Sequence, residues 1–303
     1  MYLFVKLLTL FTTWLVCKRF HVYNREATAI QTPLVIGCNH PNSFLDAILV
    51  GSLMKKRVHF LTRGDVFHKK WAVKLLQSVN MIPIYRIRDG KENLGKNDVT
   101  FELCRQVLLR DEDVLIFVEG FCNYQTTLQV PLKKGAPRLM VQGWADGVDV
   151  QLLPVWLRYN SFFDFPLGVE INFGKPFSKE VREGIEETAI VMQNINKETE
   201  RQLQQLSTIY TEPKKSVNKF LLFLPAMLGV ITHLLFFLPI KMLAKNFKGP
   251  IHYHSILFVV IAFAYPFYLV ALCITAYSIF NSILAVAIVL LLPFLAKAYV
   301  LWK

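Results

Sequence analysis

The last 84 residues, 220–303, constrain the fold most, because they contain no Asp, Glu or Arg and only five Lys. A soluble surface needs charged side chains, so a segment of this length without an acidic residue indicates membrane helices rather than a soluble core. Three apolar runs lie in it, at 220–240, 255–280 and 283–295, and the last continues toward Trp302. The first two reach the ~20 residues that span a bilayer, and the last two are close enough to form a helical hairpin.

The rest of the chain, 1–219, holds 29 of the 34 basic and all 22 acidic side chains, which gives it +7 and the tail +5. A sequence pI near 9.5 predicts an anionic partner: a nucleic acid, a phosphorylated substrate or an anionic membrane surface. The apolar tail favours the membrane, so we expect a lipid bilayer as partner and no nucleic acid. The five cysteines form no Cys-x-x-Cys pair. This argues against a disulfide framework or a zinc site and fits the cytoplasmic side of a membrane.

The first 20 residues carry an uncharged run, Leu7 to Cys17, that is too short to cross a bilayer. Lys18 and Arg19 follow it, where a signal peptide would have a small-residue cleavage site. We interpret residues 1–20 as a helix lying in the membrane interface, and the alternative is a core helix of the globular domain. Lysines on both sides of the run 220–240 predict that both of its ends face the cytoplasm. They leave open whether that run spans the membrane.

Between these ends the sequence alternates strand-like and helix-like segments. The strand-like segments are 33–39, 57–63, 81–86, 113–118 and 150–159, and helical spacing is found at 44–55, 67–79, 98–111, 133–145 and 178–209. This order predicts an α/β domain over 21–210, with a mostly parallel sheet flanked by helices. A basic linker, 211–219, joins it to the membrane helices of 220–303. Functional side chains of such sheets collect at the carboxyl ends of the strands.

The stretch "CNHPNSFLDA", 38–47, lies at one such strand end. His40 follows the first predicted strand, and Asp46 falls in the first turn of the next helix. Asp46 can accept a hydrogen bond from one ring nitrogen of His40, which leaves the other nitrogen to take a proton from a hydroxyl group. The alternative is an aspartate placed only to favour the helix dipole. Ser43 is predicted to be the N-cap, and we weigh it as a nucleophile only as a minor alternative.

"NHPNSFLD" resembles the first motif of the glycerophosphate and lysophosphatidate acyltransferase family, Asn-His-x4-Asp. Here the spacing is His-x5-Asp, one residue longer, as in fungal-type glycerol-3-phosphate acyltransferases. "NMIPIYRIRDG" resembles the second motif, which implies that Arg86 holds the phosphate of the acceptor. Arg63, after the preceding strand, is a weaker candidate for the same task.

"VLIFVEGFCNYQ" resembles the third motif, Phe-Pro-Glu-Gly, through Phe117, Glu119 and Gly120. Glu119 is expected to bond acceptor hydroxyls or to brace the loop. Val118 replaces the usual proline, and Phe121 and Cys122 stand where many relatives carry Thr-Arg. Three basic side chains at the next helix start are expected to supply charge instead: Lys133, Lys134 and Arg138. "LLPVWLRY" resembles the fourth motif and implies a lining for the acyl chain.

The resemblance implies a membrane-bound acyltransferase of phospholipid synthesis. It would move a fatty acyl group from acyl-CoA or acyl carrier protein to a hydroxyl of glycerol-3-phosphate or lysophosphatidate. His40 is the expected base, Asp46 orients it, and Asn39, Arg63, Arg86, Glu119 and Gly120 join the basic side chains in substrate binding. No cofactor or metal is expected, and His252 and His254, which flank Tyr253, are interpreted as interface-facing side chains. Two alternatives stay open: a lyso-aminolipid acceptor, and a non-catalytic membrane protein that binds anionic lipid. The sequence leaves open the acceptor, the acyl chain, the donor carrier and the oligomeric state.

Overall fold

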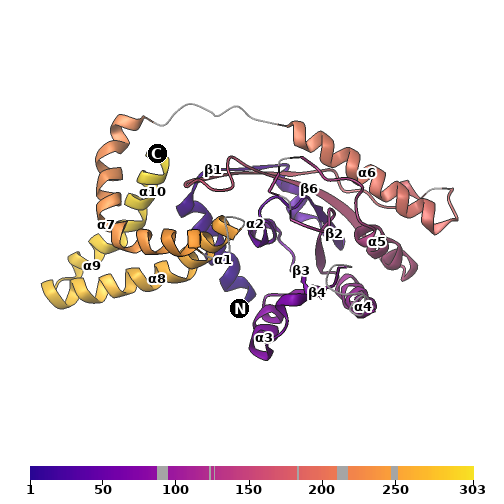
Figure 1. The fold of residues 1–303 in the computed structure, drawn as a ribbon, viewed down its shortest axis with the longest axis horizontal. Coiled ribbons are helices and arrows are strands. Elements are labelled where there is room, and N and C mark those ends of the chain that lie inside the picture. The colour runs from indigo at the N-terminus through magenta and orange to yellow at the C-terminus, as the bar shows by residue number, and fades with distance from the viewer. Residues whose placement is uncertain (87–94, 123, 126, 183, 210–217, 247–251) are drawn as a thin grey trace.

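A seven-stranded sheet forms the centre of the molecule (Figure 1). The structure is a computed structural model that describes residues 1–86, 95–122, 124–125, 127–182, 184–209, 218–246 and 252–303. The strands are β1 (Cys17–Tyr23), β2 (Leu34–Cys38), β3 (Val58–Arg63), β4 (Met81–Ile84), β5 (Asp113–Phe117), β6 (Gln151–Tyr159) and β7 (Leu167–Phe173). Their order is β1-β7-β6-β2-β5-β3-β4, and every neighbouring pair is parallel except β6 and β7. The predicted α/β class with a mostly parallel sheet is confirmed.

Helices cover both faces of this sheet. They are α1 (Tyr2–Val16), α2 (Phe44–Leu53), α3 (Lys70–Ser78), α4 (Lys96–Leu109), α5 (Gly135–Ala145) and α6 (Thr188–Thr208). Helices α4, α5 and α6 pack on one face around Leu139 and Trp156, and α1 and α2 pack on the other around Ile36 and Leu45. Every residue of β2 is buried, as expected for a central strand with helices on both sides.

Two strands were absent from the sequence prediction. The helix expected over 1–20 ends at Val16, because Cys17–Tyr23 turns into an edge strand that pairs with β7. Its burial alternates along the strand, so the side chains of Lys18 and Arg19 do not prevent pairing. Strand β7 returns beside β6 as its antiparallel neighbour. The helix predicted over 178–209 begins only at Thr188, and most of the predicted linker 211–219 lies outside the described residues.

The tail folds into helices, as its composition predicts. They are α7 (Lys219–Asn246), α8 (Tyr253–Phe280), α9 (Ile283–Leu290) and α10 (Leu292–Trp302). Three stretches of the described chain, 219–246, 253–280 and 283–302, are long and apolar enough to cross a membrane, and only 17–28% of their apolar windows is buried. Most of their apolar side chains therefore lack protein cover, which indicates membrane association. A Cβ on Gly229 would lie 2.3 Å from the carbonyl oxygen of Leu295, so glycine allows α7 and α10 to pack closely.

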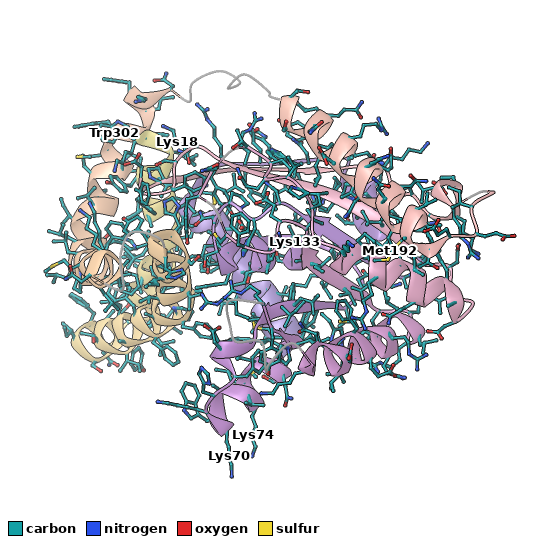
Figure 2. All side chains as sticks on the ribbon, turned by 45° about the vertical axis from the view of Figure 1, so that its right-hand side comes forward. Lys18, Lys70, Lys74, Lys133, Met192 and Trp302 are labelled. Atoms are coloured by element: carbon teal, nitrogen blue, oxygen red, sulfur yellow. The ribbon has the colours of Figure 1, made fainter. Side chains whose placement is uncertain are left out.

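The inner ends of the tail helices belong to the core of the sheet domain. Ile240 of α7 and Leu257 and Phe258 of α8 are buried in the same cluster as β2 and α2. In Figure 1 the tail helices gather at one end of the molecule, beside α1, whereas α4–α6 lie toward the other end. Figure 2 shows Lys18 and Trp302 on the same side of the molecule. The Lys297 ammonium of α10 donates to the Cys17 carbonyl oxygen of β1 at 2.7 Å. Helices α7, α8 and α10 are thus packed onto the domain at these points.

Candidate active site

His40 and Asp46 form a hydrogen-bonded pair at the carboxyl end of β2. The chain leaves β2 at Cys38, and α2 begins at Phe44, so both side chains meet across the intervening loop. His40 Nδ1 lies 2.9 Å from Asp46 Oδ2. An ionised carboxylate can only accept, so Nδ1 carries the hydrogen and Nε2 keeps its lone pair. Asp46 is fully buried, whereas 16% of the His40 side chain is exposed. A substrate can therefore reach the imidazole but not the carboxylate.

Two further donors hold the Asp46 carboxylate. The backbone N–H of Asn42 donates to Oδ2 at 2.7 Å, and the Tyr159 hydroxyl donates to Oδ1 at 2.7 Å. Burial, followed by the nearby charge of Asp46, raises the pKa of Tyr159 well above its usual value, so this phenol keeps its proton. Sequence reasoning missed both donors. Tyr159 ends the segment "LLPVWLRY" that the fourth motif had singled out, which was the signal available for it.

The imidazole ring of His40 stacks on Phe117, the last residue of β5. Their ring centroids lie 3.6 Å apart, and the planes are 8° from parallel. Phe117 thus covers one face of the imidazole. Together with the bond to Asp46, this contact fixes the plane of the ring and the direction of Nε2.

Glu119 connects the loops that follow β2 and β5. Its carboxylate is buried and accepts backbone N–H groups of Gln129 and His40. Burial is the largest cause that raises its pKa, to about 7, and the negative charge of Asp46 adds to it. Of the two tasks expected for Glu119, these contacts favour bracing of the loop.

Gly120 and Lys133 lie against each other beside Glu119. Gly120 has a φ of +75°, and a Cβ there would lie 2.8 Å from Lys133 Cγ. The position therefore needs glycine for its backbone conformation and for the passage of the lysine. The Lys133 N–H donates to the Val118 carbonyl oxygen at 2.8 Å, and Figure 2 shows Lys133 near the middle of the molecule. Lys134 follows, exposed, at the N-cap of α5.

Arg63 and Arg86 lie on the edge of the sheet that carries His40. Strands β2, β5, β3 and β4 are neighbours and parallel, so their carboxyl ends share one edge. At ~4.8 Å per strand, the ends of β3 and β4 lie about 10 and 14 Å from the end of β2. Arg63 is the last residue of β3, where its Nε donates to Asp65 Oδ1 at 3.0 Å. Arg86 comes two residues after β4.

Two predicted binding residues have other partners. Arg138 donates to Asp98 of α4 at 2.9 Å and lies 4.1 Å from the centroid of the Phe101 ring, also on α4. Its guanidinium is therefore directed at α4. Asn39 is buried, and its amide exchanges two hydrogen bonds with the backbone of Leu157, at 2.9 and 2.7 Å. Asn39 thus joins the ends of β2 and β6, and these contacts favour positioning of the loop for Asn39.

The described part of the chain shows no metal-binding cluster at the site. Within the described ranges, no three His, Cys, Asp or Glu side chains are placed to hold a metal ion. A surface hollow of about 520 Å³ lies between β7 and α6, where Gly174 and Gln202 line it. None of the residues of the His40 site contributes to that hollow.

The fold and this site define an α/β protein with a histidine–aspartate pair at the carboxyl edge of a mainly parallel sheet. Residues 19–158 match the family described as Acyltransferase, the family that the sequence motifs resemble. A curated relative is the 1-acyl-sn-glycerol-3-phosphate acyltransferase of Bacillus subtilis (strain 168), 29% identical over 125 residues. The match covers 41% of this chain and 57% of that protein, so the chain spans little more than half of this relative.

A solved structure is also similar to the chain. It is the 1-acyl-sn-glycerophosphate (LPA) acyltransferase from Thermotoga maritima, with 14% sequence identity and a TM-score of 0.48. The match covers 69% of this chain and 81% of that chain.

The raised pKa of Glu119 predicts a pH-dependent cost to the fold. Unfolded, this carboxyl ionises near pH 4.5, and folded it ionises near pH 7. Between these values the unfolded chain releases a proton that the folded protein retains, so Glu119 lowers the free energy of unfolding as the pH rises, and its effect levels off above pH 7. We expect Glu119→Gln to remove this dependence. The difference in free energy of unfolding between the variant and the unmodified protein should therefore be about 2 kcal/mol larger, in favour of the variant, at pH 8 than at pH 5.

The measurement is the melting temperature of both proteins in the same detergent at pH 5, 6, 7 and 8. Effects of all other titrating groups cancel in the difference between the two proteins. A difference that stays constant across this range would show that Glu119 does not titrate there.

Proposed function

We propose that the protein transfers a fatty acyl group from an acyl thioester to a hydroxyl of a glycerol phosphate, with 1-acylglycerol-3-phosphate as the preferred acceptor. The observation that carries this proposal is the 2.9 Å bond between His40 Nδ1 and Asp46 Oδ2, which leaves Nε2 free. The pair lies on the sheet edge that also holds Arg63 and Arg86. The Bacillus subtilis relative, named as a 1-acyl-sn-glycerol-3-phosphate acyltransferase, supports the same reaction.

The reaction needs one base and no covalent intermediate. His40 Nε2 takes the proton of the acceptor hydroxyl as the oxygen attacks the thioester carbonyl carbon. The tetrahedral intermediate then collapses, the carbon–sulfur bond breaks, and the thiolate takes the proton back from His40. Asp46 stabilises the imidazolium between these steps and keeps its orientation. A positioned base of this kind accelerates a reaction by about 10²–10⁴-fold.

Positive side chains would bind the acceptor phosphate. The guanidinium of Arg86 can hold two phosphate oxygens with parallel hydrogen bonds, and Arg63, Lys133 and Lys134 add positive charge near the same edge. The acyl donor would be acyl-CoA or the acylated form of acyl carrier protein, and no cofactor is proposed. The bilayer would supply the lipid substrate. We place the catalytic domain on the cytoplasmic face, because lysines border the first tail helix.

A lyso-aminolipid acceptor is a second candidate, favoured by one observation. Cys122 stands where relatives commonly carry a basic residue, and its sulfur accepts the Ser43 N–H at 3.1 Å. This position therefore braces the first loop and brings no charge to an acceptor phosphate.

An acceptor panel tests the proposal. Purified full-length protein in detergent micelles receives labelled palmitoyl-CoA, or palmitoyl acyl carrier protein, with glycerol-3-phosphate, 1-acylglycerol-3-phosphate or lysophosphatidylethanolamine. We expect labelled phosphatidate from 1-acylglycerol-3-phosphate as the main product. Transfer only to the aminolipid would establish the second candidate. No transfer to any acceptor, with binding to anionic vesicles, would support a non-catalytic lipid-binding protein.

A further inference from the structure

The start of α8 reaches into the loop that carries His40. His254 and Ser255 are completely buried, which corrects the interpretation of His254 as an interface-facing side chain. The Ser255 hydroxyl donates to the backbone carbonyl oxygen of Asn42 at 3.2 Å, and the side-chain amide nitrogen of Asn42 lies 3.2 Å from His254 Nδ1. The backbone N–H of the same Asn42 donates to Asp46 Oδ2. Asn42 is thus bound on two sides by α8 and on the third by the carboxylate that orients His40.

These contacts define the tautomer of His254. An amide NH₂ can only donate, so His254 Nδ1 accepts from Asn42 and the ring proton is on Nε2. Nε2 then donates to the Asp164 carbonyl oxygen, 2.8 Å away. Both ring nitrogens of this buried, neutral histidine are therefore satisfied.

The loop needs such support because of its own conformation. Ser43 has a φ of +55°, in a region that residues with a Cβ seldom adopt, and its side chain makes no cap bond to α2. Ser43 is the N-cap residue of α2, as predicted, but its hydroxyl lies 3.0 Å from His252 Nδ1 instead of capping the helix. A strained residue of this kind persists only when its surroundings hold it. The loop also has one residue more between His40 and Asp46 than the usual family spacing.

We propose that His254 and Ser255 are positioning residues for the His40–Asp46 pair: they hold Asn42 so that its N–H fixes the Asp46 carboxylate. The inference rests on the proposed acyl transfer. It assigns to a helix of the apolar tail a task beyond anchoring, because α8 supplies part of the scaffold on which the base is oriented. Small displacements of a reacting group can reduce turnover by up to about 100-fold.

Two matched variants of His254 separate this role from simple packing. In His254→Asn the amide oxygen replaces Nδ1 and can still accept from Asn42, whereas the bond to Asp164 is lost. In His254→Gln the longer side chain reaches the Nε2 position and keeps the bond to Asp164, whereas the acceptor for Asn42 is lost. Both variants remove the imidazole, and they differ in which bond they retain.

The experiment measures kcat and KM of full-length protein in detergent with palmitoyl-CoA and 1-acylglycerol-3-phosphate. We expect His254→Asn to retain kcat within about threefold, and His254→Gln and Ser255→Ala to lose about tenfold in kcat with both KM values unchanged. Equal losses in the two His254 variants would overturn the proposal. A change confined to KM or to the melting temperature would overturn it as well.

A second readout keeps the inference separate from the proposed function. In protein labelled with ¹⁵N-histidine, the Nδ1–H signal of His40, assigned by its loss in His40→Ala, reports the bond to Asp46. We expect this signal to shift in His254→Gln and to stay unchanged in His254→Asn. If the unmodified protein transfers no acyl group, the proposed function fails, and this spectrum still decides whether His254 positions the pair. An unchanged signal in His254→Gln would exclude that role.

Discussion

Replacing His40 with alanine should reduce the turnover number for acyl transfer by about 10³-fold. The variant loses the only atom that we assign as proton acceptor, Nε2, while Asp46 keeps its two other donors, Asn42 and Tyr159. The side chain is partly exposed, so its removal leaves a small gap at the surface and not a cavity in the core. Protein yield, membrane fraction and KM for the acyl donor should therefore stay unchanged. Initial rates at saturating acceptor measure the effect.

Two comparison variants make this result specific. His21→Ala removes an exposed histidine from the edge strand β1 and should leave the turnover unchanged. Asp46→Asn should reduce turnover less than His40→Ala, and the double variant should be no slower than His40→Ala, because both residues act through one imidazole. Retained activity in His40→Ala, or losses that multiply in the double variant, would contradict the assignment of His40 as base.

Replacing Arg86 with alanine should raise KM for a phosphorylated acceptor by about 100-fold. Each hydrogen bond from a guanidinium to a phosphate oxygen contributes about 1.5–3 kcal/mol, and the fork can make two. KM for the acyl-CoA donor should stay within about twofold, because we assign Arg86 to the acceptor. Arg86→Lys should recover only part of the affinity, since an ammonium lacks the planar fork. Steady-state kinetics with each substrate varied in turn measure both constants.

Arg138→Ala is the matched control for this experiment. It removes one positive charge from a nearby helix, but its guanidinium is bound to Asp98 and lies over Phe101 of α4. KM for the acceptor should therefore change little. Equal effects of the Arg86 and Arg138 variants would show that only the net positive charge matters. An equal loss for donor and acceptor in Arg86→Ala would exclude its assignment to the phosphate.

Much of the domain could be predicted from local patterns. The five strands named from the sequence agree with β2–β6, because each is a short apolar run that contrasts with the helices between them. Parallel strands place their carboxyl ends on one edge, so the positions of His40, Glu119 and Arg86 along the chain already predicted that they share that edge. Strands β1 and β7 were missed. For β1 the reason is that its mixed polar and apolar pattern follows directly on an apolar helix.

The sequence by itself determined the apolar helical tail, the class of fold and the order of the motifs, because these depend on composition and on spacings of a few residues. Only the tertiary structure decided which side chains hold the His40–Asp46 pair. Tyr159 meets Asp46 across 113 positions of the chain, and His254 meets Asn42 across 212. The tertiary structure also decided that Arg138 contacts α4 and that the hydroxyl of the N-cap residue Ser43 lies near His252. These partners depend on how β6 and α8 pack against the loop. The periodicity of the sequence does not predict which buried donor will face which acceptor.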